Sequence, residues 1–214
     1  MDPLKIAREA FFFYTRNLIQ ICILFLPVII VLMSIQYFIY YNIIEFIPES
    51  YINAVWYFAT FIFYPFYAAP FVTYIYKLER SEDIYWKELF QSGILFWRPL
   101  FIASIIVAFL TGIGVMLLII PGLWIMSRLF IAEALVVLMK TSPIDAVKQS
   151  YNMTKGFAWV VFFTIFIVTI PIVIIDYVLG QITELAPNTI VYVLEASIIE
   201  ILNLFFHKLH VLSN

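Results

Sequence analysis

The sequence has little charge, almost no cysteine and few glycines. Only 12% of its 214 residues are charged and 64% are hydrophobic, whereas a soluble domain has about 25% charged and about 45–50% apolar residues. A soluble chain of this length could not bury so much apolar surface, so a water-soluble fold is excluded. With 12 basic and 14 acidic residues, the chain also lacks the basic footprint of a nucleic-acid-binding protein, and no nucleic-acid partner is expected.

The single cysteine, Cys22, lies within an apolar stretch. One cysteine excludes both a disulfide framework and a metal cluster held by thiolates. The apolar stretches also contain no combination of His, Ser and Asp, and no spacing of metal ligands, that would point to catalysis. We therefore expect the protein not to be an enzyme and to carry no cofactor.

What the sequence has in abundance is long uncharged runs. About 20 apolar residues cross a hydrocarbon core of about 30 Å as an α-helix, so the runs predict an all-α polytopic membrane protein, a single membrane domain over residues 1–214 with six transmembrane helices. The predicted spans cover residues 17–41, 53–76, 99–120, 123–139, 157–178 and 189–206. The third and fourth spans share one long run that we divide at Pro121-Gly122, because this dipeptide favours a turn. The first run is much longer than the apolar part of a signal peptide, so we expect it to be retained.

Three segments outside the spans are predicted to be amphipathic helices in the membrane interface, at residues 3–15, 82–97 and 143–155. Lys and Arg occur before span one, after spans two, four and six, and not in the remaining connections. By the positive-inside rule, both termini are expected in the cytoplasm. Each interfacial helix precedes a pair of spans. This arrangement has two explanations: the chain contains three repeats of one unit, or the rules of membrane insertion alone produce it.

Charged residues within or near the spans are the main candidates for a functional site, because charge in hydrocarbon is costly unless it is paired or hydrated. They are Arg128, Glu133, Asp176, Glu195 and Glu200. Arg128 and Glu133 lie about 140° apart around a regular helix and cannot pair well. Counted from the outer helix ends, Arg128 and Glu195 both lie about 10 Å deep, which predicts an ion pair between spans four and six.

The same count places Glu133 and Glu200 at about 17–18 Å, near the midplane of the bilayer. Two carboxyl groups at one depth in a medium of low dielectric constant are expected to keep at least one proton. Asp176 falls close to the outer end of span five.

Two further patterns concern helix packing. Ser104, Ala108 and Gly112 recur at intervals of four in span three, which predicts a close helix contact within the chain or between subunits. Pro65 and Pro70 lie near the middle of span two. Each proline leaves a carbonyl without its helical partner, so a kink is predicted there.

The segment PGLWIMSRLFIAEALVVLMKTSPIDAVKQSYNMTKGFAW, residues 121–159, resembles a group of bacterial inner-membrane proteins that includes the YciC family and the membrane domain fused to some glycerophosphodiester phosphodiesterases. The common pattern is a Pro-Gly turn, an arginine in the next helix, a P-x-x-A-x-x-x-S segment, and a basic residue with glycine before the following span. The matching residues are Pro121, Gly122, Arg128, Pro143, Ala146, Ser150, Lys155 and Gly156. The resemblance implies a multi-pass protein of the bacterial cytoplasmic (inner) membrane, and it supplies no reaction.

Two functions follow from these patterns. The first is a non-enzymatic role in envelope or membrane organisation, with the lipid bilayer and membrane proteins or further copies of this chain as partners. In that role the charged residues of the spans hold helices together. The alternative is a small, proton-coupled transporter that uses an arginine and acids within the membrane. Its residues would be Arg128, Glu133, Glu195 and Glu200.

Overall fold

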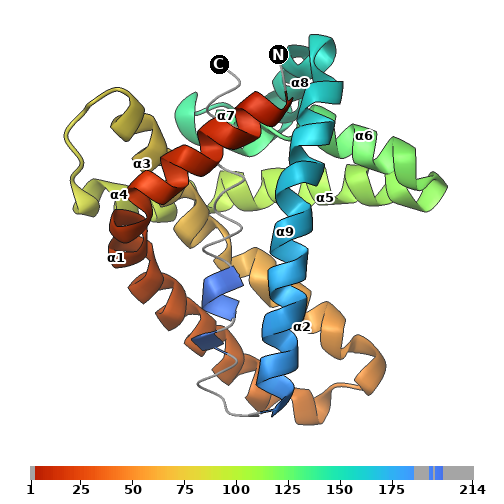
Figure 1. The fold of residues 1–214 in the computed structure, drawn as a ribbon. Helices are drawn as coiled ribbons and strands as arrows, with labels where there is room; N and C mark the ends of the chain where they lie inside the picture. Colours follow the sequence, from red (N-terminus) through yellow and green to blue (C-terminus); the bar gives the residue numbers. More distant parts are fainter. Residues whose placement is uncertain (1–2, 186–192, 195, 200–214) are drawn as a thin grey trace.

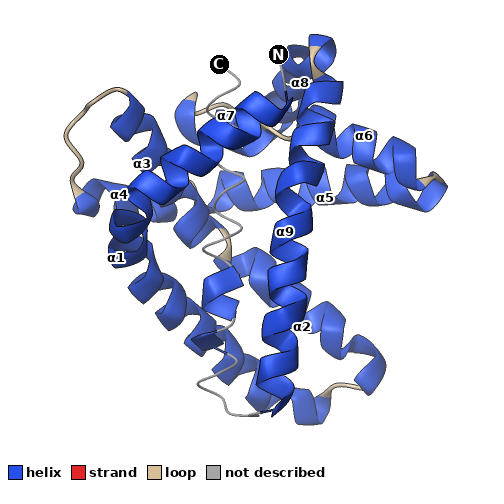
Figure 2. Cartoon of the chain, in the orientation of Figure 1, coloured by secondary structure: helices blue, strands red, loops and turns tan. Residues whose placement is uncertain are grey.

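The computed structural model is built from α-helices joined by short turns, and the residues that it describes contain no strand (Figures 1 and 2). It describes residues 3–185, 193–194 and 196–199. The main helices are α1 (Pro3–Ile43), α2 (Ile52–Phe63), α3 (Pro65–Glu79), α4 (Trp86–Leu95), α5 (Trp97–Leu117), α6 (Ile119–Leu129), α7 (Ala132–Leu138), α8 (Pro143–Met153) and α9 (Ala158–Leu185).

Four stretches are long and apolar enough to cross a membrane, and α2 with α3 makes a fifth if the bent pair counts as one span. The four are Pro3–Ile43, Trp97–Leu117, Ile119–Leu138 and Ala158–Gln181. They coincide with the first and the third to fifth predicted spans, so the chain is an all-α polytopic membrane protein. The sixth predicted span, at 189–206, lies outside the described residues except for 193–194 and 196–199.

Helix α1 differs from the prediction of an interfacial helix at 3–15 followed by a separate span. Its 41 residues form one helix, about 60 Å long at 1.5 Å per residue, and it changes direction along its length in Figure 1. The side chains of Thr15 and Asn17 bond back to the carbonyls of Phe11 and Phe13, at 3.0 and 2.8 Å. These polar residues are therefore accommodated inside the helix and do not end it.

The turn between α5 and α6 is at Leu118, and the prediction of a turn at Pro121-Gly122 is wrong. Leu118 has an extended backbone, with φ −161° and ψ 142°, and Pro121 is the third residue of α6. A proline is tolerated there because the first N–H groups of a helix have no partner within it. The glycine serves packing, since a Cβ on Gly122 would lie 2.4 Å from the backbone nitrogen of Val115 in α5.

The predicted small-residue face of span three is not a packing face within the described chain. Ser104 is buried, but Ala108 and Gly112 are exposed, and a Cβ on Gly112 would meet nothing within 4 Å. The close approach uses Gly114 instead, because a Cβ there would lie 2.7 Å from the Cα of Gly122. α5 and α6 thus form the tight hairpin that projects to the right in Figure 1. A contact of the small residues with another subunit stays a prediction.

The bend in the second span lies at Pro65, where α2 and α3 meet at an angle of 43°. The Nε1 of Trp97, at the start of α5, donates to the carbonyl of Ile62 at 2.8 Å and satisfies an acceptor next to the break. Pro70 lies inside α3, which continues through it. The carbonyl of Phe66, one turn before Pro70, is covered by α4, where a Cβ on Gly93 would come within 2.8 Å of it.

Helices α4 and α8 form where interfacial helices are predicted. Each of them also buries one side against the rest of the bundle. Small residues at intervals of four are buried against the bundle, namely Ala146 and Ser150 of α8 and Thr154 directly after it. Ile144 and Tyr151, on another side of α8, are exposed. One side of α4 is buried in the same way, at Leu89, Ser92 and Gly93. Most of the buried side chains of both helices are small, which allows a close approach to the bundle.

The described residues form two large groups of buried side chains and a small third one around Ala10. One large group joins α1 to α3, with Phe25 packed edge-to-face on Phe71 and Tyr74 at centroid distances of 5.1 and 5.8 Å. The other large group gathers residues of α3, α5, α7 and α8 around α7. α7 is buried along almost its whole length, so any polar side chain that it carries must find partners inside the bundle.

Candidate functional site

The span from Ile119 to Leu138 carries both charged residues that the sequence singles out, and it is broken in the middle. α6 ends at Leu129, residues 130–131 form a turn, and α7 begins at Ala132. Arg128 and Glu133 therefore belong to different helices and have different neighbours. No ion pair joins them in the described part of the chain.

The carboxyl group of Glu133 connects three segments of the bundle. Its two oxygens lie 2.5 Å from the hydroxyl of Tyr64, at the bend between α2 and α3, and 2.8 Å from the hydroxyl of Ser104 on α5. Ser104 is only 3% exposed. A carboxylate would accept from both hydroxyls, and a carboxylic acid would donate to one and accept from the other. Either form has hydrogen-bond partners without a counter-ion.

The partners of Glu133 are placed by the backbone around them. Pro65 bends the second span directly after Tyr64, and the Tyr64 ring packs edge-to-face on Tyr67 at 5.7 Å. Ser104 lies on the part of α5 that packs against α7. This junction brings together Glu133 and Ser104, which the sequence suggests for separate reasons. Tyr64 was not predicted, and its position before a helix-bending proline is the signal that could have identified it.

Arg128 lies at the end of α6, under α8. Its residue is 4% exposed, and its guanidinium carbon is 4.1 Å from the centre of the Tyr151 ring. Nε is buried and has no hydrogen-bond partner among the described residues. The guanidinium therefore lies against an aromatic ring, and no acidic side chain of the described residues pairs with it.

The backbone of Arg128 is better satisfied than its side chain. Because α6 ends there, its last carbonyls lack partners within the helix. The carbonyl of Arg128 accepts from the hydroxyls of Ser150 and Thr154, each at 2.9 Å. Ser150 of α8 and Thr154, directly after α8, therefore cap the C-terminus of α6. Thr154 was missed from the sequence, although it continues the spacing of four from Ala146 and Ser150.

The residues that carry the family resemblance have structural explanations in this region. Ser142 caps α8, accepting from the Asp145 backbone N–H at 3.2 Å, and Pro143 is the first residue of the helix. Ala146 and Ser150 form the docking side of α8. Lys155 and Gly156 lie exposed in the turn that follows.

Of the remaining predicted site residues, the structure describes only Asp176, which joins neither group. Asp176 is exposed on α9. Glu195 and Glu200 lie outside the described residues, so the predicted pair of Arg128 with Glu195, and the proximity of Glu133 to Glu200, stay predictions. Within the described part, no group of three or more His, Cys, Asp or Glu side chains could hold a metal ion.

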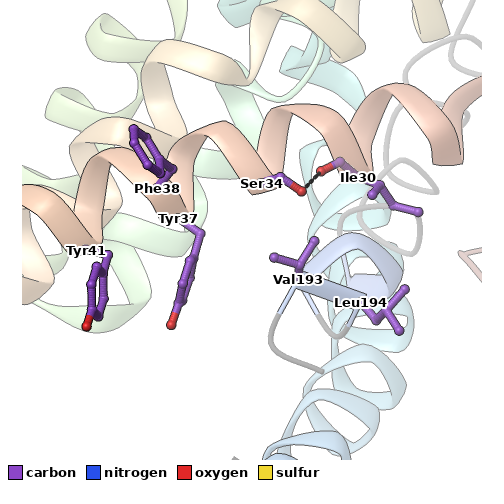
Figure 3. Close-up of a pocket in the computed structure, with 7 residues that line it drawn as sticks. All are labelled: Ile30, Ser34, Tyr37, Phe38, Tyr41, Val193 and Leu194. Carbon is purple, nitrogen blue, oxygen red and sulfur yellow. Dashed lines mark hydrogen bonds between the residues drawn. The ribbon is translucent and has the colours of Figure 1, made fainter. Parts of the chain in front are cut away.

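Two cavities are described, and neither includes Arg128 or Glu133. The first, of about 430 Å³, lies between α1 and residues 193–194 (Figure 3). Its walls are mainly apolar and aromatic, and the hydroxyl of Ser34 is bonded to the Ile30 carbonyl at 2.7 Å. The second, of about 530 Å³, lies between the start of α1 and the end of α3. Its lining residues are Phe12, Phe13, Arg16, Asn17, Leu78, Glu79 and Ser81.

Comparisons with known protein families, with curated proteins and with solved structures found no match to this chain. What the protein does must therefore be inferred from its own residues.

Proposed function

We propose that the chain is a non-enzymatic integral membrane protein of the bacterial inner membrane that serves as a helical scaffold, either in envelope organisation or as a partner in a membrane complex. The observation that carries the proposal is how the polar groups of the broken span are used. The carboxyl of Glu133 joins α7 to α3 and α5, and the carbonyl of Arg128 joins α6 to α8. These groups hold the chain's own helices together.

The membrane location draws on the apolar helices, and the orientation on the distribution of basic residues. Lys and Arg are concentrated on the side of the predicted interfacial helices, which favours a cytoplasmic position for that side and for both termini. The resemblance of residues 121–159 to inner-membrane proteins favours the same compartment.

A small proton-coupled transporter is the second candidate, and Glu133 is the observation that favours it. An ionisable carboxyl inside a span, bonded to hydroxyls of Tyr64 and Ser104, could in principle exchange a proton along that chain of groups. A carrier must also bring such an acid into contact with water on each side in turn. Both described partners of Glu133 are hydroxyls of the chain's own helices, and this is the observation that favours the scaffold.

The deciding experiment measures stability and proton flux on the same variants. The full chain is purified, its thermal unfolding is followed in detergent, and proton uptake is measured in vesicles under a pH gradient. Glu133→Gln keeps a hydrogen-bonding group, whereas Glu133→Ala removes the hydrogen bonds of Glu133 to both hydroxyls, a loss of about 1–3 kcal/mol. Asp176→Asn, on an exposed acid of α9, is the matched control.

The scaffold predicts wild-type stability for Glu133→Gln, lower stability for Glu133→Ala, and proton uptake by the wild type no faster than in protein-free vesicles. Proton uptake that the wild type supports and Glu133→Gln abolishes, while Asp176→Asn retains it, would establish the transporter and overturn the scaffold.

A further inference from the structure

The guanidinium of Arg128 lacks the anion that its burial requires. It is 4% exposed, its Nε has no partner, and in the described part of the chain it neither donates a hydrogen bond nor forms an ion pair. Arginine stays charged in proteins and has five N–H donors. A charge enclosed in this way is strongly destabilising unless an acceptor is supplied.

The groups around Arg128 compensate only part of that charge. The Tyr151 ring, with its centre 4.1 Å from the guanidinium carbon, offers its negative face. The C-terminal end of α6 adds the negative end of a helix dipole. Neither accepts hydrogen bonds along the edge of the guanidinium, so its donors remain available to an anion.

The acidic side chains of α7 and α8 have other hydrogen-bond partners than Arg128. Glu133 is bonded to the hydroxyls of Tyr64 and Ser104. The carboxylate of Asp145, at the start of α8, accepts from Ser142 at 2.7 Å. In contrast, the segment that contains α8 has three exposed lysines, whose positive charge favours an anion arriving from outside the chain. They are Lys140, Lys148 and Lys155.

The surface around α8 indicates where that anion comes from. Ile144, Tyr151 and Met153 are exposed large side chains on this helix, next to lysines of the same segment. Apolar and basic side chains exposed side by side are typical of a helix lying at the level of the lipid headgroups. The planar guanidinium matches two oxygens of a phosphate group.

We propose that Arg128, with Tyr151 against its face, binds the phosphate group of an anionic phospholipid at the cytoplasmic interface. The lipid contacts α8 with its headgroup next to the lysines, and Arg128 anchors the phosphate at the junction of α6 and α8. The site needs the chain to lie in a membrane but is independent of whether it is a scaffold.

Glu195 is the rival partner for Arg128 and lies outside the described residues. Its described neighbours Val193 and Ala196 pack against the core group of α1 and α3, and Val193 and Leu194 line the cavity beside α1. Arg128 belongs to α6, and its guanidinium lies against Tyr151 of α8. The Glu195→Gln variant tests this rival directly.

The test measures lipid binding to the purified full chain in detergent by native mass spectrometry, with phosphatidylglycerol, zwitterionic phosphatidylcholine and inorganic phosphate as probes. The loss of a charge-assisted contact predicts that Arg128→Gln binds phosphatidylglycerol about tenfold or more weakly than the wild type. Arg98→Gln, which removes an exposed arginine at the start of α5, should bind it as the wild type does. Phosphatidylcholine should bind more weakly, and millimolar inorganic phosphate should not displace phosphatidylglycerol.

Tyr151 allows the same test without a change in a buried residue, since it is 51% exposed. Tyr151→Leu should bind phosphatidylglycerol about two- to fivefold more weakly, because it loses the aromatic face, and Tyr151→Phe should bind normally. This pair decides the proposal if Arg128→Gln does not fold.

Several results would overturn the site. Equal affinity of the wild type and Arg128→Gln would show that the cation does not bind lipid, and equal affinity of Tyr151→Leu and Tyr151→Phe would overturn the proposed site of Arg128 with the Tyr151 ring. An equal loss in Arg98→Gln would show that only net charge matters. A tenfold gain in Glu195→Gln would show that Glu195 occupies Arg128. Displacement of the lipid by inorganic phosphate would show a site for the free anion.

Discussion

Replacing Gly122 by alanine tests the close packing of α6 on α5. In the structure a Cβ at Gly122 would lie 2.4 Å from the Val115 nitrogen and 2.7 Å from its Cα, whereas ordinary contacts begin at 3.4 Å. Backbone atoms cannot turn aside as a side chain can, so α5 and α6 must separate by about 1 Å, which weakens their mutual contacts. Such overpacking costs about 1–3 kcal/mol.

Alanine also favours a helix over glycine by about 1 kcal/mol. The net effect of Gly122→Ala is therefore a loss of up to about 2 kcal/mol, or up to about 8 °C in the unfolding temperature of a chain of this size. Gly112→Ala is the matched control, because a Cβ there meets nothing within 4 Å. Only the gain in helix propensity applies at that position, so the control should unfold at the wild-type temperature or a few degrees above it.

The assay is thermal unfolding of the two purified variants in one detergent, with helicity followed by circular dichroism. Equal unfolding temperatures for Gly122→Ala and Gly112→Ala would refute the close packing of α5 on α6.

Three further substitutions test two other contacts of the bundle. Ser150→Ala and Thr154→Ala should each lower the free energy of unfolding by about 0.5–1.5 kcal/mol, and because both side chains bond to the Arg128 carbonyl, the double variant should lose more than either one. Thermal unfolding measures this, and a double variant as stable as the wild type would contradict the cap. Trp97→Phe should lower stability by about 1 kcal/mol because the carbonyl of Ile62 at the bend loses its donor, and no change in the unfolding temperature would show that this bond does not support the bend.

The helical class and the presence of long apolar helices could be predicted from the sequence because apolar length is a local property. The turn at Leu118 could not, since a proline three residues into a helix looks the same in sequence as a proline in a turn. The separation between α5 and α6 depends instead on a contact of Gly122 with Val115, which involves two helices at once. The continuity of α1 could not be predicted either. Its polar residues Thr15 and Asn17 look like the end of a helix in the sequence, but they form hydrogen bonds within it.

The candidate site was predictable in its residues but not in its partners. Charge within an apolar run identifies Arg128 and Glu133 from the sequence alone. Depth counting assumed one straight helix, and the turn at 130–131 invalidates that assumption. The partner of Glu133, Tyr64, is 69 residues away, and only the packed arrangement of α3, α5 and α7 brings the two together.

The central claim is that the polar groups of the broken span hold helices of this chain together, and a double-mutant cycle between Ser104 and Glu133 tests it most directly. Ser104→Ala, Glu133→Ala and the double variant are unfolded under the same conditions, and their stabilities give the coupling between the two side chains. The hydrogen bond of 2.8 Å predicts a favourable coupling of about 0.5–2 kcal/mol. Coupling indistinguishable from zero, with both single variants as stable as the wild type, would contradict the account.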